Sequence, residues 1–141
     1  MKMVGIDKVV VDASVVLSWL LPDEKLTKKA NRLYERYADG EIELVAPDLL
    51  WYEVMNGVRS AVVQKRINKR EAKEAIKKFS ELGLEFRNQS GVFDKIVETA
   101  LKYELSVYDA SYVTLAKELG SKLATFDKKI RKSVKGGCFR V

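Results

Sequence analysis

Carboxylates occupy the sequence positions best suited to chemistry, namely Asp12, Glu53, Asp109 and Asp127. Asp12 directly follows a β-branched run at residues 9–11, and Asp127 directly follows a second, largely apolar run at residues 123–126. Ligands bind at the carboxyl ends of the strands in open parallel sheets, so two acids delivered there by two strands predict a shared site. Asp109 begins a predicted helix that aims it inward, and Glu53 lies on the sheet-packing side of another predicted helix.

The chemistry that such a set of acids predicts is the binding of divalent cations. Two carboxylates about 5 Å apart repel each other by about 3 kcal/mol at an effective dielectric of about 20, so four in one pocket require compensating charge. Hard oxygen ligands without His or Cys select Mg²⁺ or Mn²⁺. Taken singly, each acid also fits an ordinary role, as a turn residue, a helix cap or a side chain that reaches solvent.

The remaining composition excludes most other chemistry. The 141 residues include no histidine and one cysteine, Cys138. Zinc sites built from Cys and His, Ser-His-Asp triads and Cys-His nucleophiles are therefore excluded. No glycine-rich dinucleotide fingerprint follows the first apolar run, and no P-loop motif occurs anywhere. Acid–base or metal chemistry in this chain must be carried by carboxylates.

The charge of the chain favours a polyanionic partner. Lys and Arg number 26 and Asp and Glu 20, which gives a formal net charge of +6. Basic residues crowd the segment directly after Asp127, and those predicted to contact RNA phosphates are Lys128, Lys129, Arg131 and Lys132. A second basic stripe at residues 66–77 is interleaved with Glu71 and Glu74, which is typical of a solvated helix face.

The elements that must position the acids alternate between strands and helices. We predict strands at residues 8–12, 41–46, 84–87, 122–126 and 138–141, and helices at 13–21, 26–37, 47–65, 68–82, 92–101, 109–119 and 127–134. Strands separated by helices form βαβ units around a parallel sheet. The predicted fold is α/β, a three-layer α/β/α sandwich with a mostly parallel sheet of four to five strands, in a single domain over residues 1–141.

Neither a membrane span nor a secretion signal is evident. No apolar run approaches the about 18 residues that a membrane-spanning helix needs. The N-terminal residues lack the basic region, long apolar stretch and cleavage site of a secretory signal. We therefore expect a cytoplasmic protein.

The motifs around the four acids resemble those of the PIN-domain ribonucleases, and most closely those of the VapC-type toxins of toxin–antitoxin pairs. The opening Val-Val-Val-Asp12-Ala-Ser14 resembles the first acidic motif of that family, and residues 46–56 around Glu53 resemble the helix that brings the second acid. Residues 105–120 and 123–129 are similar to the third and fourth acidic motifs in order and spacing. The resemblance covers nearly the whole chain, and all four acids are present.

The resemblance implies a PIN-like fold and an Mg²⁺- or Mn²⁺-dependent endoribonuclease that hydrolyses RNA phosphodiester bonds. It also implies a homodimer and a small antitoxin protein as inhibitor. Asp12, Asp109 and Asp127 would then hold one or two ions, whereas Glu53 would either hold a second ion or orient the attacking water as a base. The alternative is a non-catalytic module that binds RNA or a protein partner on the same fold.

Three polar neighbours are candidates for steadying the acids. Ser14 and Thr125 each lie two residues from an acid at the predicted sheet edge, so their hydroxyls are positioned to support the ligands. Asn56 lies about one helical turn from Glu53 and is positioned to join the same network. Ordinary capping or strand roles remain the alternative for the two hydroxyls.

Overall fold

A five-stranded parallel sheet forms the centre of the molecule in the computed structural model, which describes residues 5–139 and 141. Its order is β3-β2-β1-β4-β5, and every adjacent pair is parallel. The strands are β1 (Asp7–Val11), β2 (Ile42–Pro47), β3 (Glu85–Arg87), β4 (Lys122–Ala124) and β5 (Cys138–Phe139). The predicted α/β fold and its parallel sheet are confirmed.

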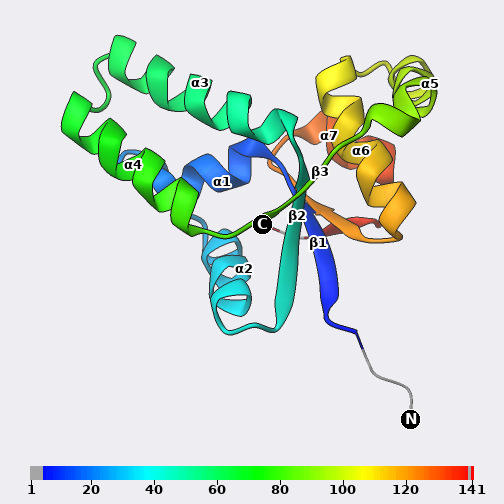
Figure 1. The fold of residues 1–141 in the computed structure, drawn as a ribbon, viewed down its shortest axis with the longest axis horizontal. Coiled ribbons are helices and arrows are strands. Elements are labelled where there is room, and N and C mark those ends of the chain that lie inside the picture. The colour runs from blue at the N-terminus through cyan, green and yellow to red at the C-terminus, as the bar shows by residue number, and fades with distance from the viewer. Residues whose placement is uncertain (1–4, 140) are drawn as a thin grey trace.

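Helices cover both faces of this sheet (Figure 1). One layer holds α1 (Ala13–Leu20), α2 (Lys28–Ala38), α3 (Leu49–Val63) and α4 (Lys69–Glu81), which connect β1 to β2 and β2 to β3. The other holds α5 (Phe93–Tyr103), preceded by a 3-10 turn at Ser90–Val92, together with α6 (Val107–Leu119) and α7 (Lys128–Val134). Because parallel crossovers are right-handed, reversing direction across the sheet after β3 moves the connections to the opposite face. No helix in the described part of the chain is long and apolar enough to cross a bilayer.

Strand β1 lies in the middle of the sheet, and its sequence explains why. Val10 and Val11 are fully buried, and Val10 lies opposite Val45 of β2 on one side and Leu123 of β4 on the other. A continuous β-branched run suits a strand that is covered on both faces. The residue that follows this strand, Asp12, therefore emerges at the centre of the sheet's carboxyl edge.

A close crossing of α1 and α3 brings α3 to the same carboxyl edge of the sheet. A Cβ atom built at Gly57 of α3 would lie 2.6 Å from Cδ1 of Leu17 in α1. Glycine at this position therefore lets the two helices approach without displacing the leucine. Glu53, about one turn before Gly57 in α3, is carried toward the start of α1 by this approach.

Side-chain capping sets several boundaries differently from the sequence prediction. The predicted strand 122–126 ends at Ala124, and the predicted helix 127–134 begins one residue later because Asp127 caps it by accepting hydrogen bonds from the amides of Lys129 and Ile130. The helix expected from residue 109 begins earlier, at Val107, behind a serine cap. Of the strand predicted at 138–141, Cys138–Phe139 is observed, and residue 140 lies outside the described residues.

Candidate active site

Asp12 is a buried carboxylate that lies between the ends of β1 and β4. Its side chain is 5% exposed and caps α1, accepting hydrogen bonds from the Val15 amide at 3.3 Å and the Ser14 hydroxyl at 2.6 Å. The Thr125 hydroxyl donates to its other oxygen. Burial raises the pKa of Asp12 above the ordinary value, and the hydrogen bonds from Ser14 and Thr125 oppose that rise. The structure thus brings both predicted hydroxyls onto the first acid.

The same two hydroxyls connect Asp12 to the fourth acid. The Thr125 hydroxyl accepts the amide of Asp127 at 2.9 Å, and the Ser14 hydroxyl accepts the amide of Phe126 at 3.2 Å. These contacts join segments more than a hundred residues apart in sequence. The turn after β4 is therefore held against the start of α1, with Asp12 and Asp127 on the same edge.

Glu53 is half-buried and bound by a tyrosine from the opposite helical layer. The hydroxyl of Tyr112, which lies in α6 and is 1% exposed, donates to Oε1 of Glu53. Burial raises the pKa of Glu53, the hydrogen bond from Tyr112 opposes the rise, and the charges of Asp12 and Asp109 add to it. Glu53 therefore lies near enough to Asp12 and Asp109 to feel their charges.

Tyr112 belongs to the candidate site through its contact with Glu53, and it was not among the residues predicted from the sequence. Its spacing marks it only as part of the apolar face of a helix. The hydroxyl of this tyrosine could have indicated the contact, because a buried tyrosine normally has a hydrogen-bond partner for its hydroxyl. A tyrosine three residues after Asp109, on an inward-facing helix, therefore indicated a polar group nearby.

Asp109 completes the set of neighbouring charges. It lies in the first turn of α6, where Ser106 caps the helix by accepting the Asp109 amide at 3.1 Å. Burial raises the pKa of Asp109, the charge of Asp127 raises it further, and the Ser106 contact and the charge of Lys129 lower it. Asp12 and Asp109 both act on Glu53, and Asp127 acts on Asp109, so each of the four acids lies within electrostatic range of at least one other.

The donor set fits a hard divalent cation in its chemistry, although the acids do not form a ready-made cage. Among residues 5–139 and 141, no three acidic, His or Cys side chains lie close enough together to hold one ion. Over the same residues, none of the four acids forms an ion pair with Lys or Arg, and the charge of Lys129 acts on Asp109 from a greater distance. Neighbouring carboxylates that form no ion pair are suited to Mg²⁺ or Mn²⁺, and coordination would require their side chains to turn from their present partners.

Comparison with known proteins agrees with this architecture. The family model described as the PIN domain matches residues 9–135. The chain belongs to the PIN-domain family. Ribonuclease VapC3 of Pyrobaculum aerophilum is 31% identical over 125 residues, which cover 87% of this chain and 92% of that protein. The relation to VapC proteins therefore extends over almost the whole length of both chains.

Two solved structures share the fold of this PIN domain. The crystal structure of PAE2754 from Pyrobaculum aerophilum superposes with a TM-score of 0.72 at 23% identity, covering 93% of this chain and 82% of that one. A toxin–antitoxin complex from Klebsiella pneumoniae superposes with a TM-score of 0.66 at 16% identity, covering 91% and 93%. At these identities the likeness is one of fold.

The residues of this PIN domain that were predicted to bind RNA or to support Glu53 differ in how near they lie to the acids. Lys129 acts on Asp109 electrostatically, and Nε of Arg131 donates to the Thr125 carbonyl at 3.0 Å. Lys128 and Lys132 are exposed on α7. Asn56 is exposed, and in the part of the chain that the structure describes it makes no hydrogen bond to Glu53. The predicted network around Glu53 therefore contains Tyr112 in place of Asn56.

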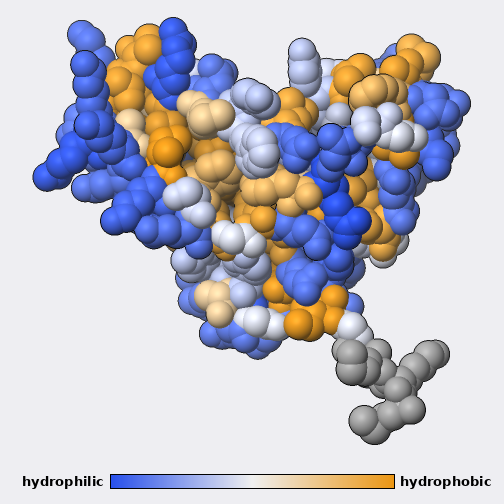
Figure 2. All heavy atoms as spheres, in the orientation of Figure 1, coloured by the Kyte–Doolittle hydropathy of each residue, from blue (hydrophilic) through white to orange (hydrophobic). Residues whose placement is uncertain are grey.

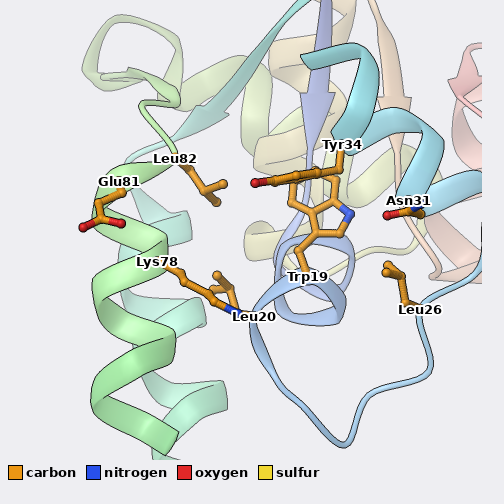
Figure 3. A pocket seen from close by; sticks show the side chains of 8 residues that line it. All are labelled: Trp19, Leu20, Leu26, Asn31, Tyr34, Lys78, Glu81 and Leu82. Atoms are coloured by element: carbon orange, nitrogen blue, oxygen red, sulfur yellow. The ribbon is translucent and has the colours of Figure 1, made fainter. Parts of the chain in front are cut away.

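A separate hollow of about 470 Å³ lies between α1, α2 and α4 of the PIN domain (Figure 3). The Trp19 and Tyr34 rings meet there edge to face, with centroids 5.6 Å apart, and Leu82 lies across from them. Lys78 and Glu81 are the charged residues of its lining, and none of the four acids reaches it. Its lining, in which aromatic and aliphatic side chains alternate with polar ones, suits contact with a partner.

Proposed function

We propose that this PIN-domain protein is an Mg²⁺- or Mn²⁺-dependent endoribonuclease of the VapC type, with its active site at the edge occupied by Asp12, Glu53, Asp109 and Asp127. The observation that carries the proposal is that the Ser14 and Thr125 hydroxyls join Asp12 to the turn that carries Asp127, with Glu53 and Asp109 near enough to feel the charges of these acids. The name of the Pyrobaculum relative, a ribonuclease, supports RNA as the substrate class. The proposed nuclease domain extends over residues 1–141.

In this mechanism, each acid has a role that follows from its surroundings. Asp12, Asp109 and Asp127 would hold one or two ions, which when bound supply Lewis acidity at the scissile phosphate and lower the pKa of a water. Ser14 and Thr125 fix the orientation of the Asp12 carboxylate. Tyr112 holds Glu53, whose raised pKa suits a group that orients a water and accepts its proton.

The test of this proposal is cleavage of single-stranded RNA by the purified protein. We expect cleavage with millimolar Mg²⁺ or Mn²⁺ and loss of cleavage in EDTA, restored when excess Mn²⁺ is added back. RNA fragments resolved on a denaturing gel provide the measurement. Binding of RNA without cleavage under either ion would favour the non-catalytic module instead, and cleavage that persists in EDTA would refute the metal dependence.

An antitoxin protein is the partner that this proposal includes. The Klebsiella structure that shares the fold is a toxin–antitoxin complex, and the relatives carry the VapC name. The hollow between α1, α2 and α4 exposes Leu26 and Tyr34, so it offers apolar surface to such a partner. Binding of the antitoxin would inhibit RNA cleavage.

A homodimer is also part of the proposal, and α5 is its proposed interface. Phe93, Val97 and Leu101 follow one another at helical spacing and are 66%, 48% and 77% exposed. Tyr108, 62% exposed, extends the apolar surface onto α6. Apolar side chains are visible over this end of the molecule in Figure 2. Because contiguous exposed apolar surface marks interaction sites, a second copy of the chain fits here.

Charge placed in this apolar surface is expected to separate the dimer. Leu101→Glu would place a carboxylate where the proposed interface excludes water, so the dimer should dissociate at micromolar concentration. Sedimentation equilibrium of the variant and the parent protein measures the change. Lys95→Gln, on the opposite side of α5, changes the net charge by the same amount and should leave the dimer intact. A parent protein that is monomeric would contradict the dimer proposal.

A further inference from the structure

We propose that the RNA substrate continues from the acid edge across Phe126 into a basic hollow between α2 and the β5 edge, where Lys29, Arg32, Lys122 and Arg131 contact its phosphates. The inference rests on the proposed nuclease function and adds the path of the substrate. Two neighbouring cavities, the positive charge that lines the second and one chain of hydrogen bonds support it.

The first cavity begins at the acid edge. It measures about 450 Å³, and its lining holds one positive and one negative side chain among otherwise uncharged ones: Ser14, Leu17, Ser18, Glu24, Lys25, Thr27 and Phe126. Ser14 donates to Asp12, so this cavity starts beside the first acid. The partly exposed ring of Phe126 forms an apolar wall next to Asp127. An aromatic ring beside a basic groove is a platform on which a single-stranded base can stack.

The second cavity is larger and basic. It measures about 820 Å³. Four cationic side chains line it, namely Lys29, Arg32, Lys122 and Arg131. Among the described residues, no Asp or Glu side chain belongs to this lining. Lys29, Arg32 and Lys122 are exposed and have no ion-pair partner in residues 5–139 and 141. Unneutralised positive charge in a concave surface attracts polyanions.

The side chains of α2 divide between two faces, one that is basic and one that lines the hollow beside α1 and α4. Lys29, Arg32 and Arg36 recur at intervals of three and four residues, so they share one face. The guanidinium of Arg36 lies 5.8 Å from the centre of the Phe139 ring, which places this face against β5. Asn31 and Tyr34 line the hollow on the α1 and α4 side instead. The basic face of α2 is therefore distinct from the surface assigned to the antitoxin.

The two cavities are linked to each other and to the acids. Thr27 lines the first cavity and caps α2, whose first turn carries Lys29 of the second cavity. On the other side, Arg131 lines the second cavity and donates to the Thr125 carbonyl, while the Thr125 hydroxyl donates to Asp12. An RNA backbone that leaves the acids can thus pass through the first cavity, in which Lys25 and Glu24 offset each other, into the positively charged second cavity.

The experiment compares RNA binding and cleavage in two charge-reversal variants with equal changes in net charge. Lys29→Glu/Arg32→Glu alters the proposed path, and Lys73→Glu/Lys77→Glu alters exposed residues of α4. Fluorescence anisotropy with labelled single-stranded RNA in EDTA measures binding. We expect the path variant to lose about tenfold or more in affinity, with a salt dependence shallower by about 1.4 logarithmic units per decade, since each single-strand phosphate contact contributes about 0.7.

Cleavage kinetics separate this inference from the nuclease proposal. With Mn²⁺, the path variant should show a raised KM for RNA and little change in kcat, and Phe126→Leu should weaken binding about fivefold through lost stacking. Equal effects in the α4 variant, or unchanged KM in the path variant of an active enzyme, would overturn the path. If no form cleaves RNA but only the path variant loses binding, the nuclease proposal fails and the RNA surface is supported.

Discussion

Replacing Asp12 by Asn is expected to reduce RNA cleavage by about a hundredfold or more, which corresponds to about 3 kcal/mol of lost transition-state stabilisation. Asp12 emerges from the central strand and is the most buried of the four acids. Removing its charge removes the proposed ion ligand that the surrounding hydroxyls hold most firmly. Initial cleavage rates at saturating Mn²⁺ provide the measurement.

The fold should survive this substitution, which makes the loss of activity interpretable. An asparagine oxygen can still accept the Val15 amide, so α1 keeps its cap. The Thr125 hydroxyl can rotate to accept the new amide group. Because burial disfavours the charged form of Asp12, the neutral residue should leave the unfolding temperature of the ion-free protein unchanged or higher.

A control at the opposite end of the sheet tests whether charge alone matters. Asp39→Asn makes the same change in net charge at the exposed end of α2, and its cleavage rate should equal that of the parent protein. Full activity in Asp12→Asn would show that this edge of the sheet is not the active site. A similar loss in both variants would point to a general electrostatic effect on RNA binding.

The ion-free protein is expected to lose stability as pH rises above about 4. Asp12, Glu53 and Asp109 have raised pKa values in the folded state, so the folded protein retains protons that the unfolded chain releases. Their stabilising contribution is complete below the ordinary carboxyl pKa of about 4 and is lost as pH rises through the raised values. Thermal unfolding in EDTA between pH 4 and 8 should show this decline, and it should be smaller in Asp12→Asn.

Divalent ions should reverse that decline at neutral pH. An ion that binds only the folded state adds about 2.7 kcal/mol at one hundred times its dissociation constant. For a domain of this size each kcal/mol raises the unfolding temperature by about 3 °C, so Mn²⁺ should raise it by about 8 °C. Potassium chloride at equal ionic strength is the control. A flat pH profile together with no response to Mn²⁺ would contradict a cation site among these acids.

The sequence was sufficient to predict the fold and the location of the acids because both depend on short-range patterns. The valine run before Asp12 marks a strand covered on both faces, and acids that follow parallel strands emerge at one edge. Helix ends were predicted less well. Near Asp127 the observed strand and helix boundaries differ from the predicted ones because the carboxylate accepts hydrogen bonds from two helix amides. The spacing of apolar residues carries no information about such a cap.

Contacts between segments that are distant along the chain could not be predicted from the sequence. The spacing that assigned Tyr112 to a buried helix face could not show that its hydroxyl meets Glu53, since the two residues come from opposite layers of the sandwich. The basic hollow was missed for a similar reason. Lys29, Arg32 and Lys122 are scattered along the chain, and only the position of α2 beside the β5 edge gathers them.

The pairing of the first strand with the fourth has a consequence during protein synthesis. Asp12 emerges early from the ribosome, but its partner hydroxyl, Thr125, and the amide contacts of Asp127 follow 113 or more residues later. A nascent chain that has not passed this point lacks one wall of the proposed catalytic pocket. We therefore expect the proposed nuclease activity to appear only after residues 125–127 have been synthesised and have packed against Asp12.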